Sequence, residues 1–217
     1  LLEKDPDTAV IVLISKPPAR ETAEKIFARV RQCKKPVVAQ FINSDSALAH
    51  EAGAYASDSF ENTARLAIAL SKGEVYTPER EENAFVRLLP LAREEAGKML
   101  ESQKYLRGLY CGGSLAEETL TLAYDRLGPI YGNIAFSDEY MLDDPFHSKG
   151  DCMIDIGAEA FTAGKPHVAI DPSPRIDRFV QEARDPETAV ILMDMLLGYA
   201  LCEDPAGMMK QVIIEEK

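Results

Sequence analysis

The chain has 217 residues, of which 46% are apolar and 28% are charged, and its formal net charge is −12. This composition is typical of a globular protein, and the acidity argues against the basic surface that nucleic-acid binding requires. With no apolar run long enough to span a bilayer, no N-terminal signal pattern and four widely spaced cysteines, we expect a cytoplasmic protein with reduced thiols and no membrane partner.

The first third of the chain alternates between strand and helix patterns. Residues 9–15 and 36–42 are short apolar runs rich in β-branched side chains, which is typical of strands buried on both faces. Residues 23–30 carry apolar side chains at helical spacing, and a brief strand at 54–56 precedes a helix that we expect to open with a capping box at residues 58–61. This alternation predicts an α/β domain with a parallel sheet.

The middle of the chain has a different character. Residues 74–104 are highly charged and carry one apolar stripe at helical spacing. We therefore predict a helical linker there, between a partial first α/β domain at residues 1–73 and a second α/β domain at residues 105–217.

The second domain repeats the strand–helix pattern. Residues 106–111 predict a strand, and Gly112-Gly113-Ser114 predicts the turn into a helix. A strand at residues 151–157, a helix from Ser173 and a long apolar run at residues 189–197 follow. We expect the last run to be the central strand of this domain.

A short phrase occurs twice in the chain. Residues 5–11 and 185–191 differ only by Asp7 against Glu187, and each opens on Asp-Pro before an apolar run. Internal similarity of this kind indicates two related structural units. Each copy lacks the neighbouring half that the other keeps, so we expect the chain to be a piece of a longer protein.

The strongest candidate for a ligand site is the turn at Gly112, Gly113 and Ser114. Ligands of parallel sheets bind where strands end and helices begin, and a helix N-terminus offers free N–H groups to an anion. A phosphate or a carboxylate would suit this turn. The alternative is an ordinary tight turn in which Ser114, spaced from Glu117 as a capping box, only caps the helix.

A second candidate is the loop that follows the strand at residues 151–157. The stretch covers residues 155–171, and its candidate residues are Asp155, Gly157, Glu159, Gly164, Lys165, His167 and Asp171. Lys165 or His167 could hold an anion that Asp171 helps to orient, since long loops after strands often carry function. The alternative is a solvated loop in which Asp171 starts a turn.

The histidines suggest weaker sites. His50 lies at a loop–helix boundary, where an imidazole can act as a phosphoryl carrier, although a lone histidine in a polar loop is usually a surface residue. His147 has carboxylates nearby, but the pattern for a metal is weak, so we predict no metal site. The sequence contains no Walker-A, Gly-x-Gly-x-x-Gly or Gly-x-Ser-x-Gly motif.

Several segments together resemble the FdrA family, which is related to succinyl-CoA synthetase and other NDP-forming acyl-CoA synthetases. The resemblance covers most of residues 1–205. The segments that carry it are residues 14–18, 106–115, 161–167, 170–172, 185–192 and 197–199.

The resemblance implies two flavodoxin-like, succinyl-CoA synthetase-like units in tandem. The helix that opens at Gly112 is similar to one of two helices whose N-termini face a phosphohistidine in succinyl-CoA synthetases. The partner helix and the CoA-binding domain would lie before Leu1, so CoA would be a cofactor only through a domain missing from this chain. The relatives' phosphohistidine lies in Gly-His-Ala-Gly-Ala, whereas residues 49–54 read Ala-His-Glu-Ala-Gly-Ala.

Three functions stay open at this point. The first is an FdrA-type acyl-CoA synthetase-like protein that binds a phosphate or carboxylate at the Gly-Gly-Ser turn. The second is a subunit of an oxamate carbamoyltransferase in allantoin and purine breakdown, and the third is a scaffold that keeps the ligase fold without its chemistry. We expect the partners to be a small anionic substrate (phosphate, carboxylate or acyl-CoA) and either further copies of the chain or companion subunits.

Overall fold

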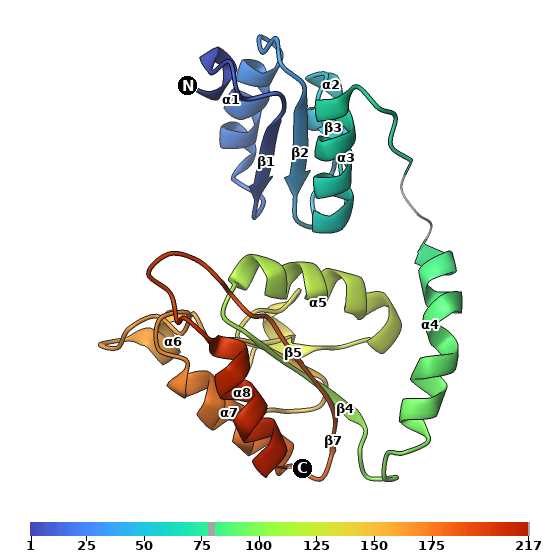
Figure 1. Cartoon of the computed structure of the whole chain (residues 1–217), viewed down its shortest axis with the longest axis vertical. Helices are drawn as coiled ribbons and strands as arrows, with labels where there is room; N and C mark the ends of the chain where they lie inside the picture. Colours follow the sequence, from blue (N-terminus) through green and yellow to red (C-terminus); the bar gives the residue numbers. More distant parts are fainter. Residues whose placement is uncertain (78–80, 217) are drawn as a thin grey trace. The chain divides into compact units, whose positions relative to one another are not determined.

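The computed structural model of the chain describes residues 1–77 and 81–216, which form two compact units, Leu1–Pro90 and Leu91–Lys217 (Figure 1). The strands are β1 (Ile11–Ser15), β2 (Val37–Phe41), β3 (Tyr55–Ala56), β4 (Tyr105–Tyr110), β5 (Tyr131–Gly132), β6 (Cys152–Asp155) and β7 (Thr188–Met193). The α-helices are α1 (Arg20–Val30), α2 (Ala47–Glu51), α3 (Phe60–Lys72), α4 (Glu81–Ala96), α5 (Gly113–Leu127), α6 (Glu159–Thr162), α7 (Ser173–Ala183) and α8 (Pro205–Glu215).

The first unit is a small parallel sheet with helices on both faces. Its strand order is β1-β2-β3, and both strand pairs are parallel. Because alternate side chains of a strand point to opposite faces, β2 sends Val37 and Ala39 to one face, where they join a core with Phe27 of α1 and Ala49 of α2. The other face of β2 packs on α3, where the hydroxyl of Thr63 donates a buried hydrogen bond to Gln40 Oε1 of β2 at 2.9 Å.

The second unit has a parallel four-stranded sheet of order β5-β6-β4-β7. One face of the sheet packs on α6, α7 and α8, and its core includes Leu109, Ile154 and Phe179. The other face packs on α5 through Tyr110 and Met153. Figure 1 shows α5 on one side of this sheet and α7 with α8 on the other. The expectation of α/β units with parallel sheets is confirmed.

Three local expectations need correction. The apolar run from residue 189 forms an edge strand, β7, and not a central one. Among the described residues β7 pairs with β4 alone, and its alternate side chains Val190 and Leu192 are exposed. The α3 helix is capped by Ser59, whose hydroxyl oxygen accepts the N–H of Asn62, and not by a box opening at Asp58. The strand expected at residues 151–157 is shorter and ends at Asp155.

The predicted linker contains α4, a helix of 16 residues with Pro90 inside it. Residues 78–80 of that linker lie outside the described residues. Within the described part of the chain, no helix is both long enough and apolar enough to cross a bilayer.

The repeated phrase builds the same local structure in both units. The Asp5 carboxylate accepts hydrogen bonds from the N–H of Asp7 and the hydroxyl of Thr8, and the Asp185 carboxylate accepts the N–H of Glu187. Each turn leads into an edge strand, β1 in one sheet and β7 in the other. The repeat therefore marks equivalent edges of two related sheets.

A buried network of ion pairs and hydrogen bonds connects the loop before β6, at Ser148 and Gly150, to β4 and to α7. Glu182 lies 3.0 Å from Arg107 Nε and 2.7 Å from Arg178 Nε, and the side chains of all three residues are at most 4% exposed. Arg107 also contacts Asp185, and Arg178 donates to Ser148 Oγ at 2.7 Å. Charges at this depth persist only when they are paired, so the network fixes the wall of the unit on which α7 lies.

Candidate functional site

The turn between β4 and α5 presents a helix N-terminus at the carboxyl edge of the second sheet. Gly112 is the N-cap in an extended conformation, and α5 begins at Gly113. The first helical hydrogen bond is made by the N–H of Ala116 to the Gly112 carbonyl at 3.0 Å. The N–H groups of Gly113, Ser114 and Leu115 precede it, and no acceptor for them is found in the described chain. The first turn of α5 therefore has donors free for an anion.

Ser114 does not cap α5, so the expected capping box with Glu117 is wrong. Ser114 is the second residue of the helix and is exposed, and the N-cap position is occupied by Gly112. A capping side chain has to stand at the N-cap, where its oxygen can reach the N–H groups of the first turn. Because glycine has no such side chain, α5 leaves its first donors uncapped.

Asp194 occupies part of the turn that we expected to be open. It follows β7, and its carboxylate accepts the N–H of Cys111 at Oδ1 and the N–H of Gly112 at Oδ2, both at 2.9 Å. The expectation that Gly112 offers its amide to a ligand is therefore wrong. The physical reason is that β7 lies beside β4, which brings a carboxylate from more than 80 residues away to this turn.

Arg175 holds the Asp194 carboxylate in place from α7. Its Nη2 donates to Asp194 Oδ1 at 2.8 Å, and its Nη1 donates to the Asp194 carbonyl at 2.6 Å. The two side chains are 3% and 2% exposed. Fixed in this way, Asp194 neutralises a buried cation and anchors the strand side of the turn, which leaves the amides of Gly113, Ser114 and Leu115 on the outer side.

Cys111 directly precedes the turn, and its buried thiol is expected to be unreactive. Burial raises the pKa of its thiol to about 11, with a smaller opposing effect of the Arg175 guanidinium. A thiol with this pKa is protonated at neutral pH, and a protonated thiol is a poor nucleophile and a poor metal ligand. We therefore assign Cys111 to the core and not to chemistry.

The candidate residues of the predicted loop lie in two separate places, as two groups. The first group is around Gly157, which packs closely against its neighbours: a Cβ atom there would lie 2.7 Å from the Cys111 carbonyl oxygen and 2.8 Å from His167 Nε2. His167 is thus brought to the edge where the β4–α5 turn lies. Its Nδ1 accepts the N–H of Ala169 at 3.2 Å, so a neutral ring carries its proton on Nε2, the atom nearer Gly157.

Asp155 has a structural position in this first group. Its carboxylate accepts the N–H of Gly157 at 2.9 Å, which shapes the turn after β6. The side-chain amide of Asn133 forms two hydrogen bonds with the backbone of Asp155. Its Nδ2 donates to the Asp155 carbonyl and its Oδ1 accepts the Asp155 N–H, both at 2.8 Å. Asn133 was not among the residues predicted from the sequence.

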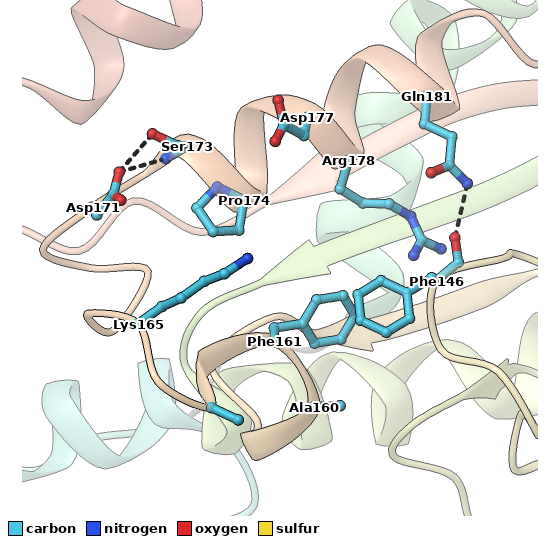
Figure 2. Close-up of a pocket in the computed structure, with 11 residues that line it drawn as sticks. Phe146, Ala160, Phe161, Lys165, Asp171, Ser173, Pro174, Asp177, Arg178 and Gln181 are labelled. Atoms are coloured by element: carbon cyan, nitrogen blue, oxygen red, sulfur yellow. Dashed lines mark hydrogen bonds between the residues drawn. The ribbon is translucent and has the colours of Figure 1, made fainter.

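Lys165 and Asp171 belong to the second group, which lines a pocket of about 480 Å³ between α6 and α7 (Figure 2). Asp171 Oδ1 accepts the N–H and the hydroxyl of Ser173, at 3.0 and 2.6 Å. These bonds, the hydroxyl first, lower the pKa of the Asp171 carboxyl. Asp171 therefore shapes the turn into α7, and the Lys165 ammonium group makes a smaller contribution to the lowered pKa of its carboxyl.

The other two histidines stand on exposed surfaces. His50 is exposed on α2 in the first unit, and no partner of its ring is found among the described residues. His147 Nδ1 lies 2.6 Å from Asp144 Oδ2, and both side chains are more than half exposed. In the part of the chain that is described, no three His, Cys, Asp or Glu side chains gather as metal ligands would.

Comparison with known proteins finds similarity both to a domain family, in the second unit, and to one longer protein. Residues 109–215 match the family model of the CoA-ligase domain. The match runs from the end of β4 to α8 and so includes the candidate turn, and it supports a succinyl-CoA synthetase-like fold. The whole chain is also 40% identical, over 219 residues, to the uncharacterized protein YahF of Escherichia coli (strain K12), and it spans 41% of the length of that relative.

The two residues that shape the turn, Asp194 and Arg175, were not among the sequence-based candidates. Asp194 had a signal, because it is the one charged residue inside the apolar run at residues 189–197. A charge in such a run has to find a specific partner when the strand is buried. Arg175 had no comparable signal, since it lies among the alternating charges of an amphipathic helix.

Proposed function

We propose that this chain is part of an FdrA-type, acyl-CoA synthetase-like protein, and that its CoA-ligase domain binds a phosphate or a carboxylate substrate at the N-terminus of α5. The observation that carries the proposal is the row of three amides, at Gly113, Ser114 and Leu115, at the exposed start of that helix. The positive end of the helix dipole reinforces these donors, so a negative charge placed there is stabilised without a lysine or arginine.

The surroundings of the turn support this assignment. The Asp194–Arg175 pair is buried, and the Asp194 carboxylate accepts hydrogen bonds from Cys111, Gly112 and Arg175, which we propose preorganises the turn for a ligand. Preorganised donors bind more tightly because no ordering cost is incurred on binding. His167 lies at the same edge, and its Nε2–H is a further candidate donor to the anion.

We assign to this chain the small anion and not the whole of CoA. The sequence lacks the Gly-x-Gly-x-x-Gly turn that cradles a dinucleotide pyrophosphate, and the amides at α5 suit one small anionic group. We therefore propose that CoA, as a cosubstrate, is bound by other parts of the longer protein, and we assign only the small anion to this domain. Further copies or companion subunits would complete a cytoplasmic enzyme.

The role of His50 as a phosphoryl carrier stays a prediction. Its imidazole is exposed on α2, and Gly53, two residues after the end of that helix, adopts a left-handed conformation with φ of 75°. Incubating the intact protein with labelled phosphate, CoA and an acyl-CoA would produce an acid-labile phosphohistidine if His50 carries phosphate. Loss of the label in His50→Asn would locate it, and absence of label in the parent protein would exclude the carrier mechanism.

The anion site itself can be tested with inorganic phosphate as the probe. Gly113→Pro removes one of the three amides, and the change is compatible with the backbone because proline is favoured as the first helical residue and the preceding Gly112 is extended. We expect the affinity for phosphate, measured by calorimetry on the whole chain, to fall about tenfold or more, since a hydrogen bond to a charged group contributes roughly 1.5–3 kcal/mol.

Ser114→Ala is the matched control, because it keeps the amide and removes only the hydroxyl. Its phosphate affinity should stay close to that of the parent chain. Amide chemical-shift changes in the parent, upon addition of phosphate, should concentrate at residues 113–115. Equal phosphate affinity in the parent and Gly113→Pro, or shifts confined to another region, would contradict the proposal.

A further inference from the structure

The pocket between α6 and α7 has the features of a second ligand site, lined by residues that do not belong to the α5 turn. Its volume of about 480 Å³ lies within the range in which proteins hold small molecules. Phe146 and Phe161 contribute an apolar surface, with ring centroids 4.7 Å apart. Phe161 is buried but Phe146 is 48% exposed, so an apolar group placed on the pair would remove aromatic surface from water.

The wall of the pocket is held in place before any ligand binds. The Phe146 carbonyl accepts a hydrogen bond from Gln181 Nε2 at 2.9 Å, and the neighbouring Pro145 carbonyl accepts one from Arg178 Nη1 at 2.6 Å. Arg178 is itself buried, and its charge is offset by Glu182 at 2.7 Å. Because its cation is already neutralised, Arg178 acts here as a rigid support and not as the charge that selects a ligand.

Two further charged side chains line the pocket. Lys165 extends between Pro174 of α7 and Phe161 of α6, and Asp177 projects from the next turn of α7 (Figure 2). Among the described residues neither forms an ion pair, with each other or with a third group. Asp171 accepts hydrogen bonds from Ser173, which favour its ionised form, and Lys165 acts on it electrostatically. The pocket therefore offers the Lys165 cation, the carboxylates of Asp171 and Asp177, and an aromatic surface.

We propose that this pocket binds a small zwitterion with an apolar group, of the kind represented by an aromatic α-amino acid. The ligand's carboxylate pairs with Lys165, its ammonium group pairs with Asp177, and its ring covers Phe146 and Phe161. A simple carboxylate has no ammonium group to pair with Asp177, and a simple amine has no carboxylate to pair with Lys165. The inference is independent of the anion site at α5.

Three related probes separate these contributions in calorimetric titrations of the whole chain. L-phenylalanine carries both charges, 3-phenylpropanoate lacks the ammonium group, and 2-phenylethylamine lacks the carboxylate. We expect L-phenylalanine to bind about tenfold or more tightly than either analogue, because each analogue loses one charge-assisted contact. No binding of L-phenylalanine at millimolar concentration, or equal binding of 3-phenylpropanoate, would overturn the proposal.

Variants assign the two charges. Lys165→Gln should weaken L-phenylalanine about tenfold and leave the weak binding of 2-phenylethylamine unchanged, and Asp177→Asn should weaken L-phenylalanine equally and leave 3-phenylpropanoate unchanged. Both side chains are exposed, so the fold should tolerate either change. Lys210→Gln, an exposed lysine of α8 outside the pocket, is the matched control, and Gly113→Pro should also leave L-phenylalanine binding intact. Binding that survives both pocket variants would place the amino acid elsewhere.

Discussion

Replacing Asp194 with asparagine tests the support of the β4–α5 turn. The carboxylate accepts three hydrogen bonds, from the N–H groups of Cys111 and Gly112 and from Arg175. Asparagine keeps one oxygen and puts an NH₂ donor where the other stood, so at least one donor loses its acceptor and the buried guanidinium loses its counter-charge. Breaking a buried ion pair in this way costs about 3–5 kcal/mol, a large part of a typical domain stability of roughly 5–15 kcal/mol.

Urea unfolding followed by circular dichroism measures the loss, and hydrogen exchange locates it. We expect a lower unfolding midpoint for the second unit and faster exchange of the amides of Cys111 and Gly112. Asp177→Asn, the same chemical change at an exposed position, should alter stability by less than about 0.5 kcal/mol. The double variant Asp194→Leu/Arg175→Met should lose less than Asp194→Leu alone, since it leaves no unpaired charge. Unchanged midpoint and unchanged exchange in Asp194→Asn would refute the reasoning.

Three further predictions concern the second unit. The Arg107 hydrogen bond lowers the pKa of Asp185, so the contribution of this carboxylate is present above the ordinary aspartate pKa and is lost as the pH falls through its lowered value. Asp185→Asn should therefore destabilise the chain by roughly 1 kcal/mol at pH 7 and by much less near pH 2, in urea titrations at each pH. Burial raises the pKa of the Cys111 thiol to about 11 and also raises that of Cys152, so neither should be alkylated by iodoacetamide at pH 8 in the native chain, as mass spectrometry can verify; modification without denaturant would disprove it. Gly157→Ala places a methyl group 2.7 Å from a backbone oxygen and should lower thermal stability by about 1–3 kcal/mol, whereas an unchanged melting temperature would mean that the turn adjusts freely.

Much of the fold was predictable because its signals are local. Apolar runs such as residues 36–42 and helical spacing such as that of residues 23–30 were predicted as a strand and a helix, and the structure has β2 and α1 there. The position of β7 was not predictable in the same way. Its run looked like a fully buried strand, but strand order depends on which elements cover the sheet, and α5 leaves Val190 and Leu192 exposed.

The site was predictable in part for the same reason. A Gly-Gly-Ser turn between a strand and a helix is a local pattern, and the structure has a strand, that turn and a helix there. The acceptor that occupies the amide of Gly112 comes from Asp194, far along the chain, and no local pattern specifies such a pairing. Lys165 and His167 are two residues apart in sequence, yet one lines the pocket and the other lies at the sheet edge, because the chain turns between them.

The repeated Asp-Pro phrase aligns the two halves of the chain and so identifies a position at which they differ. The carboxylate that braces the turn, Asp194, lies 180 residues after Ile14, and the same interval separates the two copies of the phrase. Both halves have the Asx turn and the edge strand, but only the second has an acid at this position, and Ile14 is 48% exposed. A single position therefore distinguishes the two halves: it holds an exposed isoleucine in the first and, in the second, the carboxylate that binds the amides before a helix.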